Sequence, residues 1–402
     1  MLRINHILHL YQPDFQSSDV LRKVLEESYL QIADLLKTYP EYKVTLNITG
    51  STYQIYNKYG VANLAELFRP FYERGQIVFT TTSLAHLIMP LTSDAQFERQ
   101  VKLNNDKLSE FLEEEVNPEI FFFPELFVDN KSLQKLKALN VKTAVVSENS
   151  LKSANKAIDF AKHPSGLNLI VRSTLASRAF ENRSVTSFDE LSKILTDENR
   201  TYNVVHDGEI FGHKFPEKIG FIKNLLESKK VDFVHFDESS ETIVPISDNE
   251  FDTASWEQIS YNGEKVDPHW KNPFNEVHTL QWELTNLVVN KIEELSNLGV
   301  DVTRFQGQID YIQYSCQYWW ASSLPYWNTG FVVYAAWNWV RLSHELRTAN
   351  INMDLKPFIK DVDSVFSKLI STLADYDSSG WKLKNIEYFD VNILPLRAKG
   401  VI

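Results

Sequence analysis

Short runs of β-branched and aromatic residues alternate with longer amphipathic stretches over the first 240 residues of the chain. The short runs predict strands, because such side chains suit the pleated and half-buried surface of a sheet. The longer stretches, such as 20–38 and 95–115, have the length and apolar spacing of helices. The predicted strands are 4–9, 43–49, 76–82, 119–123, 142–147, 168–172, 202–206 and 232–236. Strands that alternate with helices predict an α/β fold with parallel strands.

Two architectures fit this alternation, a closed βα barrel and an open doubly wound sheet. An open sheet that binds nucleotides usually has a Gly-rich loop after its first strand. Here the first predicted strand is followed by Leu10-Tyr11-Gln12-Pro13, which has no glycine. The sequence therefore favours the barrel, in which residues at the carboxyl ends of the strands build the active site.

The pattern becomes helical from about residue 271. Asn272-Pro273 predicts a helix N-cap followed by proline at the first helical position. Apolar residues then keep a helical period from Val277 to Leu295. Further helical segments are predicted at 305–322, 330–348 and 354–376. We expect a catalytic barrel domain over residues 1–270 and a C-terminal helical domain over 271–402 that packs on it.

Composition narrows the choice of partners. The formal net charge of −12, without a basic stripe, argues against nucleic acid as a partner. No apolar run is long enough to span a bilayer, so we expect no membrane partner. The single cysteine, Cys316, and the absence of a signal-peptide pattern favour a cytoplasmic protein. Aromatic residues make up 13% of the chain, and exposed aromatic faces are typical of sugar-binding clefts as well as of helical cores.

Two very apolar runs end abruptly at carboxylates. Phe121-Phe122-Phe123-Pro124 is followed by Glu125, and Val204-Val205-His206 is followed by Asp207. Two acids on one rim of a barrel are the arrangement that glycosidic bond cleavage requires. Glu125 is the candidate nucleophile, and Asp207 is the candidate acid/base, whose pKa a neighbouring carboxylate and burial would raise. The alternative is that both acids make structural ion pairs or cap helices.

Four sequence motifs resemble glycoside hydrolase family 57 and occur in the order of that family. Residues 9–13 (HLYQP) are similar to its His-x-His-Gln-Pro motif, with Tyr11 in place of the second His. Residues 75–78 (GQIV) resemble the second motif, with Val78 where the family usually has Glu. Residues 123–125 (FPE) match the segment that bears the family nucleophile, and residues 207–212 (DGEIFG) match the segment whose leading Asp is the acid/base.

The resemblance implies an irregular, incomplete (β/α)7 barrel followed by a helical domain. It also implies a retaining enzyme that acts on α-1,4-glucans or maltooligosaccharides through a covalent glycosyl-enzyme, without a metal or cofactor. Residues 318–320 (YWW) stand where the family has its fifth, aromatic motif. His213 and Lys214 stand near a position that is often Trp in the family. The resemblance therefore does not indicate which residue forms the sugar subsite at this position.

A set of polar and aromatic residues near the motifs are candidate contacts for sugar. They are His9, Gln12, His86, Glu209, Trp256, Trp270, Trp319 and Trp320. Each has a plainer interpretation: a structural histidine, a solvated loop acid or a packed tryptophan. Trp319 and Trp320 point in different directions on a helix, so one of them is expected to pack inward while the other reaches the cleft.

Three further functions stay open. A glucan acceptor in place of water would make the enzyme a 4-α-glucanotransferase or a branching enzyme. His206, Asp207 and His86 suit a metal-dependent carbohydrate deacetylase on a similar barrel. A non-catalytic glycan-binding protein is favoured by Val78 and Tyr11 but opposed by the intact pair of acids. The sequence does not indicate the oligomeric state.

Overall fold

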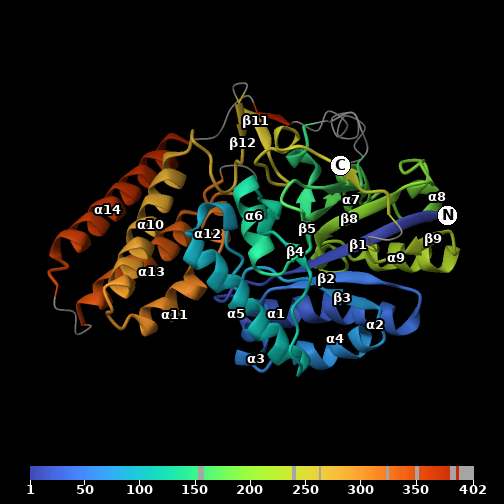
Figure 1. The fold of residues 1–402 in the computed structure, drawn as a ribbon, viewed down its shortest axis with the longest axis horizontal. Coiled ribbons are helices and arrows are strands. Elements are labelled where there is room, and N and C mark those ends of the chain that lie inside the picture. The colour runs from blue at the N-terminus through green and yellow to red at the C-terminus, as the bar shows by residue number, and fades with distance from the viewer. Residues whose placement is uncertain are drawn as a thin grey trace. The chain divides into compact units, whose positions relative to one another are not determined.

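The computed structural model describes residues 1–152, 158–237, 241–261, 264–322, 326–348, 353–380 and 386–388 (Figure 1). The chain forms two compact units. The first contains Met1–Leu84 and Met89–Trp256, and the second contains Ala85–Ile88 and the described part of Glu257–Phe389. The domain boundary that we expect at residue 270/271 stays a prediction.

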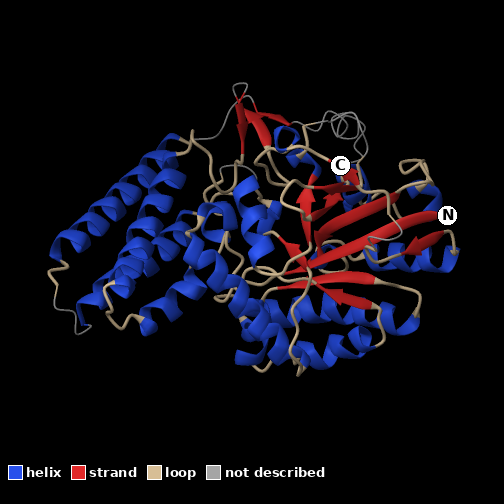
Figure 2. Cartoon of the chain, in the orientation of Figure 1, coloured by secondary structure: helices blue, strands red, loops and turns tan. Residues whose placement is uncertain are grey.

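The strands of the first unit form two five-stranded sheets (Figure 2). One has the order β3-β2-β1-β8, with β9 also paired to β1, and all its strands are parallel. Its members are β1 (Leu2–Leu10), β2 (Val44–Ile48), β3 (Ile77–Phe79), β8 (Thr201–Asp207) and β9 (Val231–Phe233). The other has the order β10-β6-β7-β5-β4. Its members are β4 (Ile120–Phe122), β5 (Thr143–Ser147), β6 (Phe160–Lys162), β7 (Asn168–Arg172) and β10 (Val244–Pro245).

Each of the eight predicted strands overlaps a strand of the structure, so the mixed α/β fold with parallel strands is confirmed. The sequence analysis missed β6, which pairs antiparallel with β7, and β10, which pairs with β6. The two sheets are linked by a parallel bridge between Thr81, just after β3, and Phe121 in β4. The irregular (β/α)7 barrel stays a prediction.

Amphipathic helices connect the strands of this unit. They are α1 (Ser18–Val24), α2 (Leu30–Thr38), α3 (Gly50–Lys58), α4 (Leu64–Glu73), α5 (Asp94–Leu112), α6 (Asn130–Ala138), α7 (Thr174–Glu181), α8 (Phe188–Leu191) and α9 (Glu217–Ser228). The helix predicted at 20–38 is interrupted by a π-helical turn at Leu25–Tyr29. Buried aliphatic and aromatic side chains of β1, β2 and β8 pack with apolar faces of these helices, which fixes the strand ends as a rigid frame.

The second unit consists mainly of helices. They are α10 (Glu276–Asn297), α11 (Thr303–Ile312), α12 (Cys316–Trp319), α13 (Thr329–Glu345) and α14 (Lys356–Ser379). The sequence analysis did not foresee its antiparallel strands β11 (Ile259–Tyr261), β12 (Glu264–Val266) and β13 (Ile386–Tyr388).

The predicted N-cap at Asn272 is wrong. Helix α10 begins at Glu276, and its N-cap is Asn275, whose side-chain oxygen accepts from Val277 N. Asn272 instead closes a turn by accepting from Phe274 N at 3.0 Å. Within the described ranges, no helix has the length and apolarity needed to cross a membrane.

Candidate functional site

Glu125 lies at the carboxyl end of β4 in an unusual backbone conformation. Its φ is 59°, and the next residue, Leu126, has a φ of 46°. A left-handed conformation costs an L-residue with a Cβ about 1–2 kcal/mol, and here two such residues are consecutive. Strained backbone of this kind persists only where its surroundings hold it, and it is common at active sites. The turn that follows Pro124 therefore presents the Glu125 carboxylate in a fixed direction.

Trp256 holds Glu125 through both its main chain and its side chain. The indole Nε1–H donates to Glu125 Oε2 at 3.1 Å, and Trp256 N donates to the Glu125 carbonyl oxygen at 3.2 Å. The indole also meets the ring of Phe122 edge to face, with centroids 6.4 Å apart. The structure thus places this candidate sugar-binding residue directly on the candidate nucleophile.

Asp207 is the last residue of β8 and stands beside His9 of β1 in the strand register. Lys214 Nζ donates to Asp207 Oδ2 at 2.7 Å. Burial raises the pKa of Asp207, but the Lys214 ammonium and then His9 outweigh burial and hold the pKa at about 2. The predicted rise in this pKa is wrong, because the sequence does not reveal that Lys214 folds back onto Asp207.

Glu209, two residues beyond Asp207, is buried and is not a solvated loop acid. Its Oε1 accepts from Gln12 Nε2 at 2.9 Å and from the Tyr29 hydroxyl at 2.7 Å. Burial first, and the charge of Asp207 second, raise the pKa of Glu209. Gln12 and Glu209, both candidate sugar contacts, therefore form one hydrogen-bonded group. The sequence analysis missed Tyr29, which lies at the end of the π-helical turn, a feature that is frequent near functional sites.

His9 is buried among groups that fix its ring. The ring stacks on Phe122 with centroids 5.0 Å apart, and Nδ1 lies 2.6 Å from Asn47 Oδ1. Asn47 Nδ2 donates to Thr80 Oγ1, so Asn47 Oδ1 is the acceptor and His9 Nδ1 is the donor. These contacts account for His9 as a structural histidine of the site, and its contact with sugar stays a prediction.

A chain of buried side chains ends on the backbone of Asp207. His206 Nδ1 is 3.0 Å from the Asp207 carbonyl oxygen, which can only accept, so Nδ1 carries the proton. Burial lowers the pKa of both His206 and His6, so each ring is neutral and has one donor and one acceptor nitrogen. His6 Nε2 then donates to His206 Nε2 at 3.1 Å, and Tyr42 donates to His6 Nδ1 at 3.0 Å.

This row of hydrogen bonds weakens the deacetylase alternative, because both ring nitrogens of His206 take part in it. A metal ligand must offer a nitrogen lone pair, and the only lone pair of neutral His206 accepts from His6. Within the part of the chain that the structure describes, no group of three or more His, Cys, Asp or Glu side chains is arranged to hold a metal ion.

The remaining candidates belong to the second unit. His86 Nδ1 lies 2.8 Å from Ser315 Oγ. Trp270 is only 1% exposed, and Trp320 is also buried, so both fill the core of this unit and are not open stacking platforms. Trp319 is partly exposed and stacks on Tyr326 with centroids 4.7 Å apart. The different directions expected for the adjacent tryptophans are thus confirmed, while sugar binding by Trp319 and His86 stays a prediction.

Solved structures of several α-glucan enzymes resemble this chain. A branching enzyme from Pyrococcus horikoshii has a TM-score of 0.66 at 12% identity, covering 93% of this chain and 96% of that one. An α-amylase from Thermotoga maritima has a TM-score of 0.64 at 13% identity, covering 92% and 99%. A 4-α-glucanotransferase from Thermococcus litoralis has a TM-score of 0.64 at 14% identity and covers 85% of this chain, which spans 58% of that enzyme. At these identities the likeness concerns the fold.

No curated protein matches the chain in sequence. A family model does match, over residues 3–248, which is more than half of the chain and includes both candidate catalytic acids. The protein belongs to glycosyl hydrolase family 57.

Proposed function

We propose that this protein is a retaining glycoside hydrolase of the amylase type that cleaves α-1,4-glucans or maltooligosaccharides. The observation that carries the proposal is the pair of acids at the carboxyl ends of β4 and β8, inside the segment matched by the family model. Glu125 is held by Trp256 on a strained turn, and Asp207 is backed by the His206 hydrogen bond. The single cysteine supports a cytoplasmic enzyme.

We also propose that the two sheets together form the incomplete (β/α)7 barrel of this family. Two contacts between the sheets support this arrangement. Thr81 N donates to Ile120 O at 2.8 Å, which joins the β3 edge to β4. Ser173 N donates to Asn203 O at 2.9 Å, which joins the end of β7 to β8. In such a ring the carboxyl ends of the parallel strands meet at one rim, where the two acids would face one substrate.

The proposed reaction has two steps. A Glu125 oxygen bonds to the anomeric carbon while the bond from that carbon to the leaving sugar oxygen breaks, and Asp207 gives its proton to that oxygen. Asp207 then removes a proton from water as the water oxygen bonds to the anomeric carbon and releases Glu125. Because Lys214 keeps Asp207 ionised in the free enzyme, the sugar oxygen must displace Lys214 from Asp207 before the first step.

Hydrolysis is proposed ahead of transfer because the connections after both acids are short. Helix α6 begins at Asn130, soon after Glu125, and α9 begins at Glu217, soon after Asp207. Neither connection provides a long lid that would exclude water from the glycosyl-enzyme. A glucanotransferase or branching enzyme would form longer or branched products from the same intermediate.

The test is product analysis of amylose and maltoheptaose digests by the wild type, Glu125→Gln and Asp207→Asn. We expect shorter sugars only from the wild type, no turnover by Glu125→Gln, and a loss of about 10²–10⁴-fold for Asp207→Asn. An aryl α-maltoside with a good leaving group needs little acid assistance, so Asp207→Asn should lose much less activity on it.

Asp129→Asn is the matched control, because it also converts an acid near Glu125 to an amide. Asp129 caps α6 by accepting from Ser132 N, and Asn is an equally good cap, so activity should persist. If the wild type forms longer or branched products, the proposed activity is glucan transfer and not hydrolysis. No turnover of any glucan by a folded wild type would overturn the proposal.

A further inference from the structure

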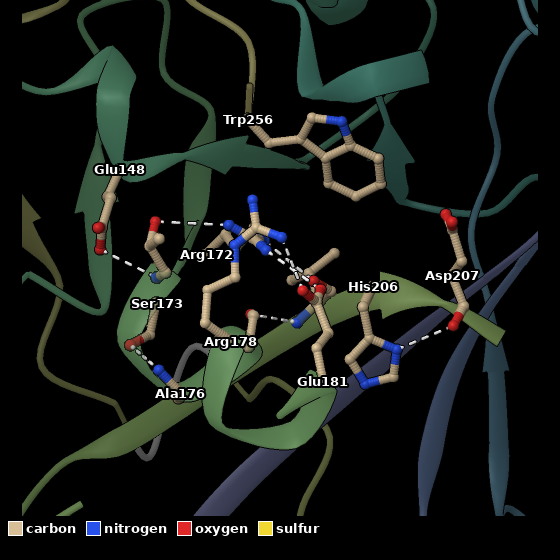
Figure 3. A network of polar contacts seen from close by, with 12 residues as sticks. Glu148, Arg172, Ser173, Ala176, Arg178, Glu181, His206, Asp207 and Trp256 are labelled. Carbon is tan, nitrogen blue, oxygen red and sulfur yellow. Dashed lines mark hydrogen bonds and ion pairs between the residues drawn. The ribbon is translucent and has the colours of Figure 1, made fainter. Parts of the chain in front are cut away.

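Arg172, at the end of β7, is an arginine buried to 2% exposure in the first unit. A buried guanidinium is costly unless its charge and its N–H groups find partners. Arg172 Nε donates to the carbonyl oxygen of Val205 at 2.9 Å, and one terminal nitrogen lies 3.4 Å from Thr174 Oγ1. Its other terminal nitrogen is 3.7 Å from Glu181 Oε1 (Figure 3). None of these contacts is explained by the proposed reaction.

Glu181 is shared between two guanidinium groups. Arg178 binds its Oε2 at 2.8 Å, while Arg172 faces its Oε1. Helix α7, which begins at Thr174 and ends at Glu181, therefore supplies contacts to Arg172 from both of its ends. Figure 3 shows Arg172 and Arg178 on either side of the contacts with Glu181.

The guanidinium lies over the indole of Trp256, with its central carbon 5.6 Å from the ring centroid. This is the range of a cation–π contact, and here the guanidinium is buried while the indole is partly buried. Trp256 is the residue whose Nε1–H donates to Glu125 Oε2. The same guanidinium also binds the carbonyl of Val205, two residues before Asp207 on β8. Arg172 thus contacts both the partner of one candidate catalytic acid and the strand that bears the other.

We propose that Arg172 is a positioning residue for the nucleophile, which orients the Trp256 indole so that its N–H holds the Glu125 carboxylate. The inference rests on the proposed function of Glu125. A cation over the indole draws electron density from the ring and makes its N–H a stronger donor. A hydrogen bond donated to a carboxylate favours the ionised form, which is the form that attacks the anomeric carbon.

The experiment compares Arg172→Met, Trp256→Phe and the double variant, with the rate of covalent labelling by 5-fluoro-α-glucosyl fluoride and the pH profile of kcat/KM on maltoheptaose as readouts. We expect each single variant to lower kcat and the labelling rate by about 10–100-fold, with little change in KM. The double variant should fall no further than the lower single variant, because Arg172 acts through Trp256. The acid limb should move to higher pH in all three.

Other charged and titratable groups lie near this network. They are Glu148, Arg178, Glu181, His206, Asp207 and Lys214. Arg172→Met also removes a charge that faces Glu181 and that lowers the pKa of His206, whereas Trp256→Phe leaves these charged groups in place. The shift of the acid limb between the wild type and Trp256→Phe therefore reports the carboxylate whose donor is lost. Trp256→Phe keeps an aromatic ring at this position and removes the indole N–H. It therefore provides the pH test even if Arg172→Met does not fold.

The matched control is Arg200→Met. Arg200 is a partly buried arginine that binds Asp159 and lies 4.7 Å from the ring centroid of Tyr202, so it combines an ion pair with a cation–π contact elsewhere in the unit. The kcat, the labelling rate and the acid limb of the Arg200→Met variant should match those of the wild type. Multiplicative effects in the double variant, or an unmoved acid limb in Trp256→Phe, would overturn the positioning role. Absence of labelling at Glu125 in the wild type would instead overturn the proposed function itself.

Discussion

The neutral histidine chain behind Asp207 makes the stability of the first unit sensitive to acid. His206 is 1% exposed, and burial lowers its pKa from 6.5 to about 4. Its Nε2 must stay unprotonated to accept from His6, and protonation would break that hydrogen bond. The folded protein therefore excludes a proton that the unfolded chain binds.

The sign follows from that difference. Between pH 6.5 and 4 the unfolded state binds a proton at His206 and the folded state does not, so stability is fully present above pH 6.5 and falls as the pH falls. The interval between the two pKa values corresponds to about 3 kcal/mol. Over this range one such histidine contributes a slope of about 1.4 kcal/mol per pH unit. His6, whose pKa burial also lowers, adds to the wild-type slope.

Urea unfolding at pH 7, 6, 5 and 4 measures this slope for the wild type and for His206→Gln. The glutamine amide can accept from His6 and donate to the Asp207 carbonyl, but it does not titrate. We expect the free energy of unfolding of His206→Gln to fall less steeply than that of the wild type, by the slope of one histidine. Phe180→Leu, which changes a ring stacked on His206, should lower stability at every pH and keep the wild-type slope. Equal slopes for the wild type and His206→Gln would refute the reasoning.

Two further substitutions test the surroundings of the acid/base. Lys214→Met should raise the pKa of Asp207 from about 2, because burial remains while the ammonium that lowers this pKa most is lost. The basic limb of kcat/KM should move to higher pH, and an unmoved limb would contradict the role of Lys214. Gly212→Ala should lower the free energy of unfolding by roughly 2–4 kcal/mol in urea titrations, because φ is +97° and a Cβ would lie 1.7 Å from the carbonyl oxygen of Glu27. Gly220→Ala, whose Cβ would meet nothing within 4 Å, is the control and should be neutral or stabilising.

The strands could be predicted because buried parallel strands appear in the sequence as uninterrupted apolar runs. All five residues of β2 and all five of β7 are buried, and both strands were predicted with nearly correct ends. β6 has only three residues and is defined by its antiparallel pairing with β7. No local sequence pattern predicts that pairing. The N-cap of α10 failed for a similar reason, since two asparagines compete and Asn275 is fixed by donating to Ala321 O, far along the chain.

The candidate acids could be found because each ends an apolar strand, but their environments could not. The left-handed backbone of Glu125 has no sequence signature, since glycine is the residue that normally marks it. The contact between Arg172 and Trp256 joins positions far apart in the sequence. Side-chain partners of this kind depend on the packing of whole elements, so the sequence predicts the residues of the candidate site but not their electrostatics.

Those electrostatics bear directly on acid catalysis. Asp207 and Glu209 are two residues apart, yet the pKa of Asp207 is lowered and that of Glu209 is raised. Environments that drive two carboxyl pKa values apart normally mark which one keeps a proton to higher pH, and here the raised pKa belongs to Glu209. Glu209, however, is buried and already accepts from Gln12 and Tyr29. Asp207 becomes a general acid only when Lys214 leaves, since burial then favours its protonated form. Displacement of one ammonium by the incoming sugar would thus couple substrate binding to proton uptake at the acid.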